Sequence, residues 1–186
     1  MSLPRTRHAA LLAVPLLLLP LAACGEDAAA AVTTVSAGSV STVDDVPAPD
    51  EDDVVLTFTG GATNTDGELR LSLAQLESMP TVEATVHEPF LDEDVVFRGV
   101  PLEDVLALVD LPDDVDTVHT VAYNEYAVDL PLSVADTPGA ILATRADGEE
   151  IALEDGGPTR VVFTDEHPAA GDEALWIWSL ATVGPA

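Results

Sequence analysis

The sequence has one cysteine, Cys24, which lies close to the amino terminus. No disulfide can therefore form within the region that follows it, and no thiolate from that region can bind a metal ion. A fold without disulfides has to be held together by its apolar core. The chain is thus neither a disulfide-stapled domain nor a carrier of a thiolate-ligated metal in its main body.

The sequence also has no lysine, and its six basic residues are set against 34 acidic residues. The formal net charge is −28. A surface this negative repels nucleic acid and anionic lipid head groups, so neither is expected as a partner. The acidic excess either attracts cations or basic proteins or only keeps the protein soluble, and the second interpretation is favoured.

The first residues have the pattern of an export signal. Arg5 and Arg7 precede an apolar run over residues 9–19, which Pro15 interrupts, and small residues follow it. This run is too short for a membrane-spanning helix, which needs about 20 apolar residues. The pattern predicts a cleaved leader rather than a membrane span.

Leu21-Ala22-Ala23-Cys24 resembles the lipobox of bacterial lipoproteins. That resemblance implies a signal peptide over residues 1–23 and a diacylglyceryl group on Cys24. More than one acyl chain gives stable anchoring, at roughly 0.8 kcal/mol per buried CH₂. We therefore expect a protein attached through lipidated Cys24 to the extracytoplasmic face of the cell membrane. A buried structural cysteine is the alternative.

Residues 24–53 are small, polar and acidic, and they show no apolar periodicity. Such a composition buries too little surface to offset its ordering entropy, which predicts a disordered tether of about 30 Å. Residues 54–186 remain, and they suffice for one domain with a single core.

Short, β-branched and often alternating segments dominate that domain. Strands are predicted at 54–60, 68–72, 81–87, 94–99, 117–123, 126–131, 140–145, 159–163 and 175–183, with a hairpin turn at Asp147-Gly148. One short helix follows a capping box of Ser72 and Gln75, and a second begins at Pro101. The fold class is α+β, with a mixed or antiparallel sheet. The sequence does not predict a dinucleotide-binding fold or a P-loop, because it lacks a repeating βαβ alternation and both glycine motifs.

Several segments, in order, resemble the oxidoreductase molybdopterin-binding domain family, which has the sulfite-oxidase-like fold. The carriers are LTFTGGATNTDGELRLSLAQLESMP, FRGVPLEDVLALV, YAVDLPL, ILATRADGEEIALEDGGPTRVVF and LWIWSLATV. The resemblance covers nearly all of residues 54–183. It implies an oxidoreductase fold around a molybdopterin pocket, with the helix after Gly99-Val100-Pro101-Leu102 beside that pocket.

The chain departs from the family at the metal ligand. Catalytic members hold molybdenum through a cysteine shortly after the strand that corresponds to residues 81–87. Here the sequence reads His87-Glu88-Pro89-Phe90. A soft thiolate suits molybdenum in a way that imidazole and carboxylate do not. The chain therefore resembles compact exported members that keep the fold without this ligand.

Six residues are candidates for ligand binding, because they are polar or aromatic and lie near strand ends or in an apolar setting. They are His87, Glu88, Tyr123, Asn124, Arg160 and Trp176. Alternatives stay open for several of them. Asn124 and Glu125 also suit a tight turn, and Arg160 suits pairing with a carboxylate. Trp176 and Trp178 alternate, so they are expected on one face of the last strand, where at least one packs in the core.

Two strand ends also carry possible metal ligands. If they meet, His87, Asp165 and His167 have the side chains that a divalent ion such as zinc prefers. Solvated loop charges are the default interpretation of the same residues.

The sequence thus predicts a lipid-anchored extracytoplasmic binding module for a small molecule or an envelope protein, without molybdenum. The alternative is an active oxidoreductase that holds molybdopterin or another metal through ligands other than cysteine. A passive acidic surface protein is a third possibility.

Overall fold

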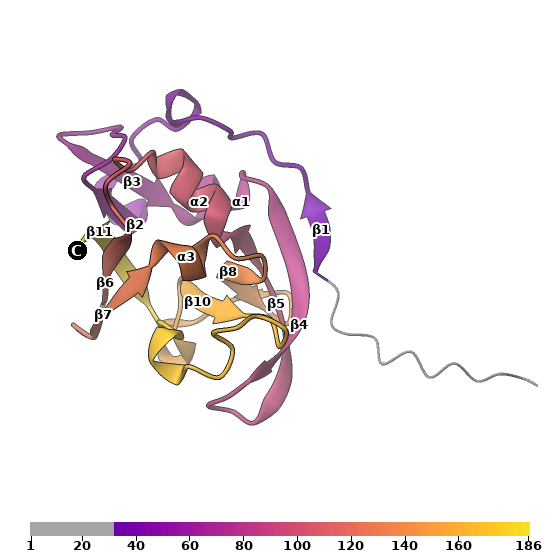
Figure 1. Cartoon of the computed structure of the whole chain (residues 1–186). Helices are drawn as coiled ribbons and strands as arrows, with labels where there is room; N and C mark the ends of the chain where they lie inside the picture. The colour runs from indigo at the N-terminus through magenta and orange to yellow at the C-terminus, as the bar shows by residue number, and fades with distance from the viewer. Residues whose placement is uncertain (1–31) are drawn as a thin grey trace, which may run out of the picture.

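The computed structural model describes residues 32–186, and its strands form two sheets (Figure 1). The first sheet has the order β1-β4-β5-β8-β10, and β9 pairs with β8. Its strands are β1 (Thr33–Ser36), β4 (Thr81–Glu88), β5 (Glu93–Pro101), β8 (Ala140–Ala146), β9 (Glu149–Glu150) and β10 (Arg160–Phe163). All of its pairs are antiparallel.

The second sheet has the order β3-β2-β11-β6-β7. Its strands are β2 (Val54–Thr59), β3 (Glu68–Ser72), β6 (Thr117–Ala122), β7 (Ala127–Pro131) and β11 (Leu180–Pro185). Only β2 and β11 are parallel, so the predicted mixed or antiparallel α+β architecture is confirmed.

Alternation along the strands explains which face of each sheet is buried. In β4, Val82, Ala84 and Val86 are buried, whereas Glu83 and Thr85 between them are exposed. Side chains of a strand point alternately to opposite faces, so this pattern directs one face of the sheet to the core. The buried side chains of both sheets and the helices form one hydrophobic cluster.

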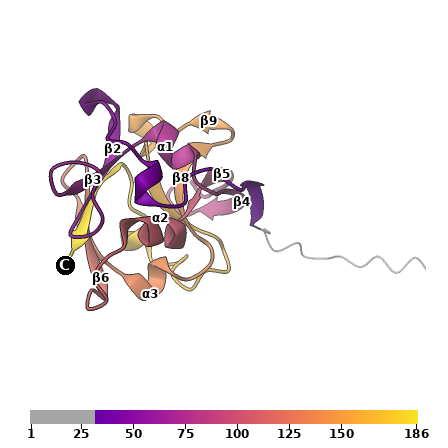
Figure 2. The ribbon, with the colours of Figure 1, turned by 90° about the horizontal axis from the view of Figure 1, so that it is seen from above.

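Short helices connect the strands and cover one end of the core (Figure 2). They are α1 (Leu73–Glu77), α2 (Leu102–Val109) and α3 (Leu132–Ala135), with 3-10 turns η1 (Val43–Asp45), η2 (Glu51–Asp53), η3 (Leu153–Asp155) and η4 (Glu173–Leu175). The predicted capping box starts α1, because the Gln75 N–H donates to Ser72 Oγ and the Ser72 N–H donates to Gln75 Oε1. Among residues 32–186, no helix has the length and apolar character needed to cross a membrane.

The tether prediction is wrong for residues 33–53. β1 pairs with the edge of β4, and Val40 and Val46 are buried at 8% and 2% exposure. From β1 this amino-terminal segment passes over the end of the domain to β2 (Figure 1). The average composition of the predicted tether gave no sign of this ordered segment. Backbone pairing between strands needs no apolar side chain, and two buried valines hardly change the mean hydropathy of the stretch. The signal peptide, Cys24 and the rest of the tether lie outside the described residues.

The last predicted strand is wrong at its start. β11 begins at Leu180, because η4 precedes Trp176 and the chain turns at Ser179, whose φ is 52°. Trp176 and Trp178 therefore lie in an irregular segment and do not share one face of a strand. This displacement takes both indoles out of the sheet and toward the candidate site.

Candidate functional site

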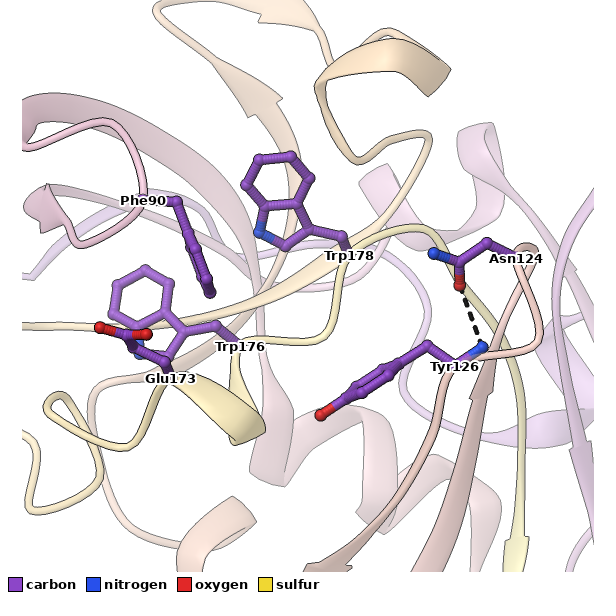
Figure 3. Close-up of a pocket in the computed structure, with 6 residues that line it drawn as sticks. All are labelled: Phe90, Asn124, Tyr126, Glu173, Trp176 and Trp178. Atoms are coloured by element: carbon purple, nitrogen blue, oxygen red, sulfur yellow. Dashed lines mark hydrogen bonds between the residues drawn. The ribbon is translucent and has the colours of Figure 1, made fainter.

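A cavity of about 340 Å³ lies where the β4–β5 loop, the β6–β7 turn and the segment around η4 meet. Its lining residues are Phe90, Asn124, Tyr126, Glu173, Trp176 and Trp178 (Figure 3). The chain has only two tryptophans and two tyrosines, so this first cavity collects both indoles and one phenol. Flat apolar walls with a few polar groups are typical of a small-molecule site.

Hydrogen bonds to the backbone fix two of the aromatic walls. Trp176 is 3% exposed, and its Nε1–H donates to the Ala170 carbonyl at 3.0 Å. The Tyr126 hydroxyl donates to the Ala174 carbonyl at 3.0 Å and so joins the β6–β7 turn to η4. Because both polar tips already have acceptors, these two residues offer ring faces and edges to a ligand.

The Trp178 indole lies between two other side chains. Phe90 meets it edge to face, with 5.5 Å between the ring centroids and 79° between the planes. The Arg160 guanidinium carbon lies 4.2 Å from the indole centroid, a cation–π arrangement. Gly156, at φ 87°, packs directly against the indole, because a Cβ there would come within 2.7 Å of it. These contacts fix the position of the Trp178 ring.

Two polar side chains complete the first cavity. Asn124 Oδ1 accepts the Tyr126 N–H at 3.0 Å, which leaves the Asn124 amide NH₂ without a partner among residues 32–186 (Figure 3). The Glu173 carboxylate likewise has no hydrogen-bond donor in that part of the chain. The cavity therefore offers one amide donor and one carboxylate acceptor between its aromatic walls.

A second cavity of about 280 Å³ also borders Trp178. Its lining includes Leu91, Val95, Phe97 and Ile151, the carboxylates of Glu93, Glu149, Glu150 and Asp155, and Arg160. Because acidic residues outnumber the single arginine, this cavity is unsuited to an anion.

Behind both cavities lies a buried ion pair. Arg160 Nη2 donates to Glu88 Oε1 at 2.5 Å, and the two side chains are 3% and 0% exposed. Glu88 Oε2 also accepts the N–H groups of Phe90 and Leu91 at 2.8 and 2.7 Å. Burial lowers the pKa of Arg160, while the hydrogen bond to Glu88 opposes that shift. The predicted pairing of Arg160 with a carboxylate is confirmed.

Two buried donors beside the cavities have no acceptor within the described part of the chain. They are Arg160 Nε and Trp178 Nε1. A buried donor without an acceptor costs about 1–3 kcal/mol. Although carboxylates line both cavities, none of them accepts from these two donors, which favours a ligand that brings acceptor atoms to them.

The predicted metal residues do not form a cluster. The Nδ1 atom of the His87 ring lies 3.2 Å from Asp94 Oδ1, and the backbone N–H of His87 donates to Asp165 Oδ1 at 2.9 Å. His167 is buried elsewhere, where both of its ring nitrogens contact backbone groups. No group of three or more possible metal ligands occurs within residues 32–186. The metal site predicted from His87, Asp165 and His167 is therefore not formed.

The structure brings together only part of the predicted ligand site. Asn124 and Trp176 line the first cavity, and Arg160 lines the second. Glu88 is buried behind them, and neither cavity is lined by His87 or Tyr123. The Tyr123 hydroxyl instead donates to the Val55 carbonyl. The β6–β7 turn prediction is also correct, because Glu125 has a φ of 66°.

The first cavity contains four further residues: Phe90, Tyr126, Glu173 and Trp178. The concentration of aromatic residues in loops, beside strand ends, was a signal for the three aromatic residues, and no signal in the sequence indicated Glu173. That concentration did not show which loops meet.

The model of the family described as the oxidoreductase molybdopterin binding domain matches residues 92–177. The predicted resemblance to this family is confirmed. The chain is also similar to the crystal structure of the sulfane dehydrogenase SoxCD from Paracoccus pantotrophus, with a TM-score of 0.56 and 17% sequence identity. That alignment covers 74% of this chain and 39% of the SoxCD chain, so the similarity shows the fold. No curated protein matches the chain.

The described residues do not fit a molybdenum–molybdopterin centre. None of them is a cysteine, since the sole cysteine is Cys24. The only arginine that lines either cavity, Arg160, already pairs with Glu88, so it is not left over for a cofactor phosphate. The two cavities therefore lack free basic side chains that match a phosphate.

Proposed function

We propose that the chain is a lipid-anchored binding module on the extracytoplasmic face of the cell membrane. It holds an uncharged, flat nitrogen heterocycle in the first cavity and performs no molybdenum chemistry. The observation that carries this proposal is the set of four aromatic walls with one amide and one carboxylate between them. Such walls stack on a planar ring, and the two polar groups fix its orientation.

The chemistry of the cavity and the family together favour a pterin. The family is named for binding a molybdopterin, whose ring system is a pterin. A pterin has an amine and ring N–H groups that suit Glu173, and acceptor atoms that suit the buried donors and the Asn124 amide. The excess of carboxylates and the paired Arg160 argue against a phosphorylated form.

Titration of the full chain with neopterin, an unphosphorylated pterin, tests this function. The two tryptophans both line the first cavity, so binding quenches their fluorescence, and calorimetry gives the stoichiometry. We expect saturable one-to-one binding. The absence of both fluorescence quenching and a heat of binding at millimolar neopterin would contradict the proposal.

Two tyrosines of neighbouring sequence provide a matched pair of variants. Tyr126→Ala removes a cavity wall and is expected to weaken neopterin binding about tenfold, which is the loss of roughly one aromatic contact. Tyr123→Ala removes a similarly exposed ring that lies outside the cavity, so its affinity stays that of the wild type.

The competing function is a molybdenum-dependent oxidoreductase. Elemental analysis of protein from a host that makes the cofactor separates the two functions, because only the oxidoreductase carries stoichiometric molybdenum. The anchor is tested separately with Cys24→Ser. That change is expected to abolish incorporation of labelled fatty acid and to release the protein from the membrane fraction.

A further inference from the structure

We propose that Glu88 is the positioning and specificity residue of the ligand site. It holds Phe90 in place opposite Trp178 and cancels the positive charge of Arg160, although it lines neither cavity. The inference rests on the proposed function and adds the reason why an uncharged ligand is selected.

The position of the β4–β5 loop depends on Glu88. Phe90 and Leu91 are 48% and 52% exposed, so packing of their own side chains holds the loop only weakly. Their backbone N–H groups both donate to Glu88 Oε2. One buried carboxylate thereby fixes a wall of the first cavity, Phe90, and a wall of the second, Leu91.

The charge of the site also depends on Glu88. Arg160 is 2% exposed and lines the second cavity. Its guanidinium lies against the Trp178 ring, which borders both cavities. With Glu88 ionised beside it, the arginine adds no net charge there. Without that carboxylate, the buried guanidinium of Arg160 has no charged partner in contact with it. The four carboxylates that line the second cavity belong to exposed residues and are screened by solvent, so the unpaired guanidinium can still bind a small anion.

Another ion pair, which joins β8 to α1, provides a control. Arg145 and Glu77 form two hydrogen bonds, at 2.6 and 3.0 Å, and neither residue lines the first or second cavity. Glu77→Gln therefore disturbs an Arg–Glu pair of the fold that contacts no residue of the first cavity.

Three variants distinguish the effect of Glu88 on the position of the β4–β5 loop from its effect on the charge beside Arg160. Glu88→Asp keeps the charge but shortens the side chain by one CH₂, which withdraws it from the loop N–H groups. Because Phe90 covers Trp178, we expect stronger acrylamide quenching of tryptophan fluorescence and an approximately tenfold weaker affinity for neopterin. Glu77→Gln behaves as the wild type in both measurements. Unchanged quenching and unchanged affinity in Glu88→Asp overturn the proposal.

Glu88→Gln keeps the shape and removes the charge. We expect inorganic phosphate to raise the melting temperature of this variant above its value in chloride at equal ionic strength. The wild type and Glu77→Gln should show no such increase. If Glu88→Gln is unfolded in chloride, recovery of its fold in phosphate is the same result. A phosphate effect that is equal in all three proteins, or absent from Glu88→Gln, overturns the proposal.

Failure of the proposed role of Glu88 can be distinguished from failure of the proposed function. If the wild type binds no neopterin, the proposed function fails. The acrylamide and phosphate measurements need no heterocycle, so they still decide the role of Glu88.

Discussion

At the scale of single residues, two histidines lie in opposite environments. His167 is buried and stacks on Phe163, and its Nδ1 accepts the Ala169 N–H at 3.0 Å. Its Nε2 therefore carries the proton that it donates to the Val134 carbonyl. Burial lowers the pKa of His167. His87 is exposed, and its hydrogen bond with Asp94 raises the pKa of His87.

We expect NMR titration of the ring protons to place the pKa of His167 below 6.5 and that of His87 above it. His167 has a lower pKa in the folded state than in the unfolded state, so it binds a proton less readily when the protein is folded. The stability contributed by His167 is therefore present above the unfolded pKa of about 6.5, and it is lost as the pH falls from there through the lower folded pKa. The sign is opposite for His87, whose contribution is lost as the pH rises through its folded pKa. A His167 ring that titrates above 6.5 would contradict this account.

Gly156 and Gly148 provide a second prediction at the residue scale. Both have a positive φ, 87° and 86°, so alanine is strained at either position. A Cβ meets nothing within 4 Å at Gly148, whereas at Gly156 it comes within 2.7 Å of the Trp178 ring. Urea unfolding should show a loss of about 1 kcal/mol for Gly148→Ala and about 3 kcal/mol for Gly156→Ala. Equal losses would mean that the Trp178 ring does not rest on Gly156.

At the scale of elements, the amino-terminal segment is predicted to stabilise the domain through a few side chains. Val46 is 2% exposed, and Val46→Ala removes two buried CH₂ equivalents, so the free energy of unfolding should fall by about 1.5 kcal/mol. Val35→Ala, at 43% exposure on β1, is the control and should change it by less than about 0.5 kcal/mol. A neutral Val46→Ala in chemical denaturation would show that the segment contributes no stability there.

The elements themselves could be predicted wherever local pattern decides them. Alternating β-branched residues locate β4 and β6, and the Ser72–Gln75 capping box locates α1. The local sequence pattern did not predict the structure of segments whose conformation depends on residues far away in the sequence. β1 is a strand because the edge of β4 is available to it, and residues 177–179 leave the sheet for bonds such as that from the Ser179 N–H to the Gly156 carbonyl.

The candidate site was predictable only in part for the same reason. Asn124 and Trp176 stand out in sequence as a turn amide and an aromatic residue near a strand. Phe90 and Glu173 acquire a role only because the β4–β5 loop and η4 come together in space. Glu88 was expected to contact a ligand, but it became a buried partner of Arg160, 72 residues away in sequence. No spacing rule connects residues so far apart.

At the scale of the whole molecule, the net charge of −28 sets the response to salt. Like charges at this density repel one another, and the repulsion opposes compaction. Added salt shortens the screening length from about 10 Å at 0.1 M to about 3 Å at 1 M. The melting temperature should therefore rise with NaCl over that range, in contrast to a protein whose surface ion pairs are its main electrostatic contribution. The ion pairs Arg70–Glu68, Arg145–Glu77 and Arg160–Glu88 are too few to reverse this trend. A melting temperature that falls as NaCl is raised would show that local pairs, rather than overall repulsion, dominate the electrostatics of the fold.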